Sequence, residues 1–218
     1  MKNTDKLWID IWSKEKYKSI GEVSTKEDMP VCFASFAHAM GVYFKENMKI
    51  LDYGCGPARF CNFMSQRLEN FEYYGVEPNS TYGNSVMEDA KAFYGQDKRV
   101  QLGFIGEDIE RKAMGKVDVV LLISIFTHLT IEQTRDIIRK LYSVVERGGA
   151  IVFSVILKDK YELCGQRAYS LADAYKVVFN ASEQIEDLAR EFNCSIRLQD
   201  EWLHVNEWMH SIYKITNV

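Results

Sequence analysis

Gly54 and Gly56 lie in a short segment, LDYGCGPAR at 51–59, that follows a predicted strand and opens a predicted helix. Glycines at this point remove the side chains that would keep a ligand away from the backbone at the carboxyl edge of a sheet. The helix beyond them offers unpaired N–H groups and a positive dipole end. Pro57 suits its first turn, where a missing N–H costs nothing. The segment therefore predicts a loop that binds a small ligand through its backbone.

Glu77 ends the next predicted strand, in YYGVEPN. A carboxylate there can accept hydrogen bonds from both hydroxyls of an adenosine ribose, and its separation from the glycines is about that of the acidic residue in dinucleotide sites. Either feature alone is explained equally well by a tight turn or by an ordinary strand-end charge. Together, in register, the two predict a nucleoside-binding site.

Arg59 bears on which nucleoside cofactor this is. In the G-x-G-x-x-G pattern of nicotinamide and flavin sites, the third glycine permits close contact between helix and strand. Arg59 occupies that third position here, and its side chain would crowd the contact. The sequence therefore disfavours a dinucleotide pyrophosphate.

His204, Glu207 and His210 have a spacing that invites comparison with a metal site. They fall in a predicted strand hairpin, however, where those offsets need not converge on one point. The five cysteines form an odd count without C-x-x-C spacing, which argues against a disulfide framework and a thiolate zinc site. We predict no metal site.

The elements that must position these residues begin at Lys49. From there, short runs rich in Val, Ile and Leu alternate with amphipathic segments. Strands are predicted at 49–53, 71–77, 99–104, 117–124 and 150–157, and helices at 57–69, 81–94 and 130–145. Near-continuous apolar strands separated by helices indicate a parallel sheet covered on both faces. We predict a doubly wound α/β fold.

The tail departs from this alternation. After a helix at 182–193, two strand-like runs, 195–205 and 210–218, are separated by too few residues for a helical crossover. They must therefore pair as a hairpin, which makes one strand antiparallel to the rest. The predicted sheet is thus seven-stranded and mostly parallel, with an antiparallel strand in a C-terminal hairpin.

The 218 residues suit a single domain, 1–218, made of an N-terminal helical cap, 1–48, and a ligand-binding core, 49–218. The net charge of -4 gives no whole-molecule attraction to a phosphate backbone or an anionic membrane, so nucleic acid is a disfavoured partner. The longest apolar runs are too short to span a bilayer. We expect a folded cytoplasmic protein that does not enter membranes.

With Asp52 in front, the glycine segment reads D-x-G-x-G-x-A and resembles the first motif of the class I S-adenosylmethionine-dependent methyltransferases. Ala58 stands where that family most often carries a third glycine. VDVVLLISIFTHL resembles the family's fourth strand with its trailing histidine, and ERGGAIVFSVI is similar to the glycine pair before its fifth strand. The terminal hairpin is also a family feature, so the resemblance covers about Lys49 to Val218.

The resemblance implies a set of cofactor-binding residues. Glu77 corresponds to the ribose acid, and the methionine end of S-adenosylmethionine would lie at the glycine loop, formed by Asp52, Gly54, Cys55 and Gly56. Arg59 would meet the cofactor carboxylate or remain a solvated helix arginine. The remaining residues implied are Pro78 and Asn79 beside the ribose and adenine, Glu107, Asp108 and Ile109 near the adenine, and Ile123 and Ser124 at the floor near the sulfonium. The choice between Glu107 and Asp108 as the adenine acid stays open.

His128 follows the strand that resembles the family's fourth, and Thr130 to Gln133 gives the next helix a capping-box start. Beside the transferred methyl group, its imidazole would take a proton from the acceptor, titrating near neutrality. An architectural role in the loop is the alternative. Aromatic and basic residues outside the family motifs would form a lid over the acceptor: Trp8, Trp12, Tyr17, Tyr161, Arg167, Tyr169 and Tyr175.

The resemblance implies a methyltransferase that uses S-adenosylmethionine. No basic stripe or appended RNA-binding segment is visible, which favours transfer to an oxygen or nitrogen of a small-molecule acceptor. The alternatives are a macromolecular acceptor, tRNA or protein, and a protein that binds S-adenosylmethionine without catalysis. The sequence leaves the acceptor's identity and the oligomeric state open.

Overall fold

The computed structural model describes residues 44–113, 116–157, 179–180, 182–192, 195–205 and 208–216. The predicted helical cap lies almost entirely outside these residues, as do all seven aromatic and basic residues predicted to form a lid. The chain divides into two compact units, whose described parts are 44–113 and 116–216 with the gaps given above.

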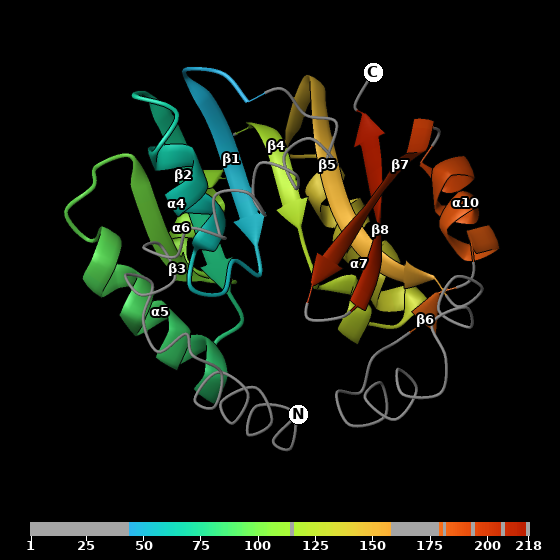
Figure 1. Cartoon of the computed structure of the whole chain (residues 1–218), viewed down its shortest axis with the longest axis horizontal. Helices are drawn as coiled ribbons and strands as arrows, with labels where there is room; N and C mark the ends of the chain where they lie inside the picture. The colour runs from blue at the N-terminus through green and yellow to red at the C-terminus, as the bar shows by residue number, and fades with distance from the viewer. Residues whose placement is uncertain are drawn as a thin grey trace. The chain divides into compact units, whose positions relative to one another are not determined.

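The first unit alternates strands and helices. Its elements are β1 (Met48–Tyr53), α4 (Arg59–Ser65), β2 (Phe71–Glu77), α5 (Thr81–Tyr94), β3 (Val100–Phe104) and α6 (Asp108–Ala113). The strands lie in the order β3-β2-β1, all parallel (Figure 1). The strands predicted at 49–53, 71–77 and 99–104 are therefore confirmed to within one residue at each end.

Burial explains why these segments form inner strands. Every residue of β2 except Glu72 is buried, and in β1 only Lys49 is exposed. A strand with apolar side chains on both faces needs cover on both faces, and the crossover helices of a parallel sheet provide it. Helices α5 and α6 contact β3, and α6 also contacts β2.

The second unit contains the remaining described elements. These are β4 (Val117–Leu122), the 3-10 turn η1 (Phe126–His128), α7 (Ile131–Tyr142), β5 (Val145–Leu157), β6 (Phe179–Asn180), α10 (Ser182–Glu191), β7 (Ser195–Val205) and β8 (Trp208–Thr216). The strands lie in the order β4-β5-β8-β7 (Figure 1). Strand β6, two residues that pair parallel to β5, was not predicted, so the described residues hold eight strands where seven were expected.

The predicted C-terminal hairpin is confirmed. Strands β7 and β8 pair antiparallel from Val205↔Trp208 outward, and β8 pairs antiparallel with β5. The ring of Tyr213 on β8 stacks on Phe153 of β5 at 5.6 Å between centroids, and Phe153 also meets Phe126 of η1 at 5.2 Å. Apolar side chains thus join the hairpin, the central strand and the turn after β4 into one core.

Strand β5 begins earlier than expected. The prediction placed its start at Ala150, after the glycine pair, whereas Val145 already pairs with Val117 and the register then shifts before Val119↔Ala150. Gly148 takes a φ of 80° within this irregular stretch. The glycines therefore lie inside the strand, where an irregularity needs a left-handed residue.

Helix α7 starts as predicted. Thr130 accepts a hydrogen bond from the Gln133 N–H, and the Gln133 side chain accepts one from the Thr130 N–H, which completes the capping box. The helix buries Ile138 and Leu141 and contacts β5. No helix among the described residues is both long and apolar enough to cross a membrane.

Candidate active site

The turn after β1 has a left-handed backbone at both of its glycines. Gly54 has a φ of 82° and Gly56 a φ of 53°, conformations in which a side chain is disfavoured. The N–H groups of Gly54 and Cys55 both donate to the carbonyl oxygen of Val76, at 2.7 and 3.2 Å. These bonds tie the turn to the end of β2 and set its glycines beside Glu77.

Helix α4 starts later than the sequence suggests. It begins at Arg59, with Ala58 as its N-cap, so Pro57 precedes the helix and is not in its first turn. Ala58 is fully buried and has a φ of 56°. Ala58, at the position of the family's third glycine, thus takes the left-handed conformation for which glycine is better suited.

Glu77 ends β2 with a buried carboxylate, only 5% exposed. Its Oε1 accepts a hydrogen bond from the N–H of Gly56. Burial raises the pKa of Glu77 to about 7, opposed by the Gly56 hydrogen bond and reinforced by the negative charge of Asp52. The two elements that the sequence paired, the glycine turn and the strand-end acid, therefore meet in the fold.

Asp52 is the second buried carboxylate beside this turn, 6% exposed. The hydroxyl of Tyr73 donates to its Oδ2 at 2.6 Å, and burial raises the pKa of Asp52 to about 6 in spite of that bond. Sequence reasoning missed Tyr73, although its position two residues before Gly75 and four before Glu77 puts it on the same face of β2. Two desolvated acids at one turn favour a ligand that carries positive charge.

Cys55 is buried within the turn, and burial raises the pKa of its thiol well above the ordinary value. It is therefore a packing residue and a poor nucleophile. A Cβ on Gly75 would lie 2.9 Å from its sulfur and 2.7 Å from Leu102 Cδ2. Gly75 therefore leaves the space that the turn occupies. It is a second residue that the sequence analysis did not identify.

Pro78 and Asn79 follow β2 and are exposed. A Cβ on Gly83 would lie 2.1 Å from the carbonyl oxygen of Pro78, so this glycine lets α5 begin directly beneath the segment. Ser80 caps α5 by accepting from the Gly83 N–H at 3.0 Å. Pro78 and Asn79 are thus held at the carboxyl end of β2 by the start of the next helix.

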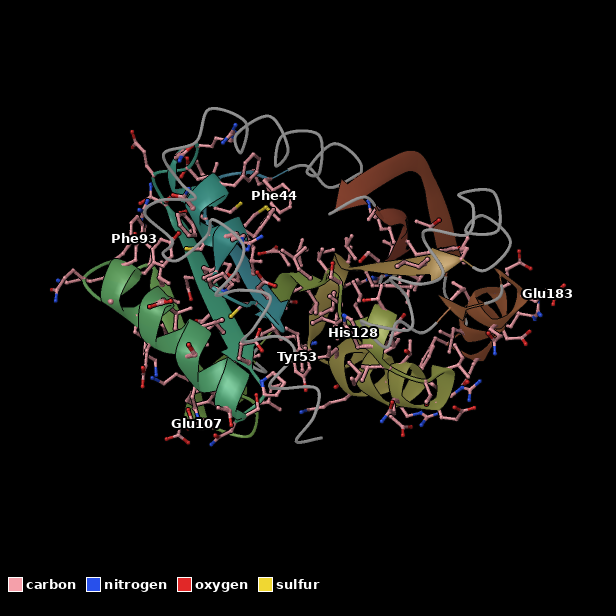
Figure 2. The ribbon with its side chains drawn as sticks, turned by 60° about the horizontal axis from the view of Figure 1, so that its bottom comes forward. Phe44, Tyr53, Phe93, Glu107, His128 and Glu183 are labelled. Atoms are coloured by element: carbon pink, nitrogen blue, oxygen red, sulfur yellow. The ribbon has the colours of Figure 1, made fainter. Side chains whose placement is uncertain are left out.

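Glu107 lies in the turn between β3 and α6 (Figure 2), and its Oε2 accepts from the N–H of Phe104 at 3.1 Å. Asp108 and Ile109 are the first two residues of α6. Both acids are exposed, so geometry in this unit does not choose between them. Arg59, the first residue of α4, is half-buried.

In the second unit, Ile123 and Ser124 follow β4. Ser124 has a φ of 60° although it is not glycine. Its N–H donates to Oγ of the fully buried Ser154 on β5 at 2.8 Å, and its carbonyl accepts from Oγ1 of Thr127 at 3.0 Å. Ser154 and Thr127 thus hold this strained turn from two sides. The sequence analysis identified neither residue.

His128 ends the short η1 turn between β4 and α7 (Figure 2), and its backbone N–H donates to the backbone carbonyl of Ile125 at 3.0 Å. Burial lowers the pKa of its imidazole to about 4. This corrects the near-neutral titration expected from the sequence. At pH 7 the side chain is a neutral imidazole that can accept a proton.

The histidines and glutamate considered for a metal fall where the structure gives no side-chain positions: His204 and His210 lie in strands β7 and β8, and Glu207 lies outside the described residues. Within the described part of the chain, no three His, Cys, Asp or Glu side chains are grouped to hold a metal ion.

The sequence matches a family model described as a methyltransferase domain over residues 26–199. No curated protein matches it. The fold is similar to that of magnesium protoporphyrin IX methyltransferase from Synechocystis PCC 6803, with TM-scores of 0.63 for the structure with bound SAM and 0.64 for that with bound SAH. The identities are 14% and 17%, and the alignments cover 98% of this chain and 90% and 94% of that one.

An O-methyltransferase family protein from Burkholderia thailandensis is also similar, with a TM-score of 0.58 and 12% identity over 91% of this chain and 55% of that chain. The family match covers well over half of the sequence and includes parts of both units. These likenesses confirm the predicted fold class, a mostly parallel doubly wound sheet with an antiparallel C-terminal strand. The chain belongs to the methyltransferase-domain family, as a class I S-adenosylmethionine-dependent methyltransferase.

Proposed function

We propose that this methyltransferase transfers the methyl group of S-adenosylmethionine to an oxygen or nitrogen of a small-molecule acceptor. Two observations support a small acceptor. The net charge of -4 gives no attraction to nucleic acid, and a structural neighbour that this chain covers almost end to end is named for a porphyrin acceptor. The cofactor supplies an electrophilic methyl group on a sulfonium sulfur, and the protein supplies orientation and a base.

The observation that carries the cofactor assignment is the bond between Glu77 and Gly56 at the end of β2. One carboxylate oxygen fixes the glycine turn, so Glu77 both shapes the turn and can accept hydrogen bonds from ribose hydroxyls. In this proposal the backbone of Gly54, Cys55 and Gly56, together with Asp52, binds the amino-acid end. Gly54 and Gly56 have no Cβ, so no side chain at either position blocks that approach, and their positive φ disfavours a residue that would add one.

The other proposed contacts follow the sequence assignment. Pro78 and Asn79 flank the ribose and adenine, Glu107 or Asp108 with Ile109 meets the adenine, and Ile123 and Ser124 form the floor. Arg59 meets the cofactor carboxylate.

His128 acts in the proposal as the general base. Its neutral imidazole would take the proton from an acceptor hydroxyl or amine as that oxygen or nitrogen bonds to the methyl carbon, while the bond from that carbon to the sulfonium sulfur breaks and S-adenosylhomocysteine leaves. Burial keeps the imidazole neutral down to about pH 4, so its unprotonated form is available throughout the neutral range, although the lowered pKa makes it a weaker base than an exposed histidine. Acidification to pH 5 should therefore leave it unprotonated.

A transfer assay with methyl-labelled S-adenosylmethionine tests the acceptor class. The parent protein is incubated with a cell extract separated by dialysis into small molecules and macromolecules. Label should appear in the dialysable fraction, and the Glu77→Ala variant should give much less. Label in the retained fraction that nuclease or protease releases would overturn the small-molecule proposal.

A further inference from the structure

Asp52 has a buried polar partner that its own sequence motif does not contain. In the register of the sheet, Asp52 lies opposite Gly75 on β2. Residues two apart on a strand share a face, so Tyr73 flanks Asp52 on one side. The Tyr73 hydroxyl donates to Asp52 Oδ2 at 2.6 Å, and both side chains are buried. Water therefore competes little for this hydrogen bond.

We propose that Tyr73 is a positioning residue of the cofactor site, whose hydroxyl holds the Asp52 carboxylate ionised and oriented for the cationic amino group of the cofactor. This inference rests on the proposed placement of the cofactor's amino-acid end at Asp52. Among the described residues, the one hydrogen bond recorded to this carboxylate is made through Oδ2, which leaves Oδ1 for a ligand. Tyr73 acts through Asp52 and does not itself touch the cofactor.

The charges around Asp52 explain why such a donor is needed. The titratable groups that face it within the described unit are Tyr73 and Glu77 on β2, Cys55 in the turn and Cys61 on α4. All of them are neutral or acidic. Burial raises the pKa of Asp52, and the Tyr73 hydrogen bond lowers it. The hydroxyl thus opposes desolvation at a position where the neighbouring acid, Glu77, adds repulsion.

Tyr73 is also a dependable donor. Burial raises the pKa of its hydroxyl well above the ordinary value, and the negative charge of Asp52 raises it further. The phenol therefore keeps its proton across the whole working pH range. Without that donor, the carboxylate would take up a proton at a higher pH and lose its attraction for an ammonium group.

The test compares two ligands that differ at the amino-acid end. S-adenosylhomocysteine carries the amino acid, whereas methylthioadenosine keeps the adenosine and the thioether but lacks it. Calorimetry measures both affinities for the parent and for Tyr73→Phe between pH 5 and pH 8. The affinity ratio is the affinity for S-adenosylhomocysteine divided by that for methylthioadenosine. Because both ligands carry the ribose, any titration of Glu77 cancels in this ratio, which therefore reports on the methionine end alone.

In the parent, this ratio should fall as the pH drops through about 6, where Asp52 becomes protonated. Removing a hydrogen bond to a charged group should raise that midpoint in Tyr73→Phe by about one to two pH units. The variant's ratio should then be about 5-fold to 50-fold lower than the parent's at pH 6, and about twofold lower or less at pH 8. Methylthioadenosine binding should be nearly unchanged.

Tyr74→Phe is the matched control. It removes the same atom from the adjacent residue of β2, whose side chain points to the opposite face and donates to Glu72 at 2.6 Å. Its affinity ratio should follow that of the parent at every pH. A merely structural role for Tyr73 would lower the affinity ratio equally at pH 6 and pH 8, and that result would overturn the inference.

Asp52→Asn provides a second measurement that does not depend on the folding of Tyr73→Phe. Its affinity ratio should be flat across this pH range, and a parent ratio that is already flat would overturn the inference. If the parent binds both ligands while Tyr73→Phe behaves like Tyr74→Phe, the role of Tyr73 fails and the cofactor assignment stands. Failure of the parent to bind either ligand would refute the proposed function itself.

Discussion

The turns after β1 and after β4 both require a left-handed backbone conformation, but they stabilise it with different residues. Both carry left-handed conformations immediately after a buried parallel strand, at Gly54 and Gly56 in one turn and at Ser124 in the other. The first turn uses glycine at two of its left-handed positions, where this conformation costs little, and alanine at a third, Ala58. In the second turn, buried hydroxyls of Ser154 and Thr127 hold an ordinary residue there. Glycine makes the first turn visible in the sequence, whereas the second is visible only in the fold.

The two turns also differ in charge. Beside the first lie two buried carboxylates, Asp52 and Glu77, whose pKa values burial raises to about 6 and about 7. In the second turn, Ser124 is hydrogen-bonded to the neutral hydroxyls of Ser154 and Thr127. The first turn thus fits the proposed binding of a cationic cofactor, and the second precedes His128, the proposed base, whose imidazole is neutral at pH 7.

The largest effect is expected from His128→Ala in the second turn. If His128 is the general base, turnover should fall by roughly 100-fold to 10,000-fold with cofactor affinity nearly intact, because the lost contact acts in the transition state. Above about pH 5 the parent's rate should show no titration from this group, since its pKa is about 4. Steady-state kinetics from pH 5 to 8 measure both, and turnover within about threefold of the parent would end the general-base role.

Glu77→Ala should act on binding. The variant loses an acceptor for up to two ribose hydroxyls, and each hydrogen bond to a charged group is worth roughly 1.5 to 3 kcal/mol. Cofactor affinity should therefore weaken by about tenfold to a thousandfold or more. Calorimetry with S-adenosylhomocysteine measures the change, and Glu72→Ala on the same strand serves as the control. Equal affinity in Glu77→Ala and the parent would remove the ribose assignment.

Ser154→Ala should destabilise the second turn by about 1 to 3 kcal/mol, because the Ser124 N–H then loses its buried acceptor. Ser124→Gly in that background should recover part of the loss, since glycine relieves the left-handed strain. Urea unfolding of the single and double variants measures this. A Ser124→Gly change that further destabilises Ser154→Ala would contradict the account of the turn.

Glu77→Gln should make the ligand-free protein more stable near neutral pH by up to about 3 kcal/mol. A carboxyl whose folded pKa is raised contributes stability below its ordinary pKa of 4.5 and loses it as the pH rises through about 7. The gain of the neutral amide should therefore be present at pH 8 and vanish near pH 4. Thermal unfolding across that range measures it, and a pH-independent gain would point to packing instead of charge.

Ala58→Gly should have the smallest effect. Glycine removes about 1 to 2 kcal/mol of left-handed strain at φ 56° but adds roughly 0.4 to 1 kcal/mol of unfolded-state entropy. The net gain in stability should lie between about 0 and 1.6 kcal/mol. Denaturant unfolding measures the change in the free energy of unfolding. Ala90→Gly, at a buried alanine within α5, is the control and should lose stability. A clear loss of stability in Ala58→Gly would contradict backbone strain at Ala58.

The sequence by itself determined the features that depend on neighbours along the chain. Alternating apolar runs and amphipathic segments predicted the strand and helix order, and the short gap between the runs at 195–205 and 210–218 required a hairpin. The capping box at Thr130 and Gln133 and the glycine turn were visible for the same reason: a local conformation selects its own residues. The pairing of Gly56 with Glu77 was anticipated because parallel strands bring their carboxyl ends to one edge.

Only the tertiary structure decided those long-range contacts whose residues belong to no recognisable motif. Tyr73 meets Asp52 across 21 positions and Ser154 meets Ser124 across 30, and each contact exists because strand register brings those residues together. The pKa of His128 likewise depends on burial by surrounding elements, which no short motif encodes. Local pattern therefore specified which elements form and where the glycine turn lies, while register and burial set the protonation states of the acids beside it.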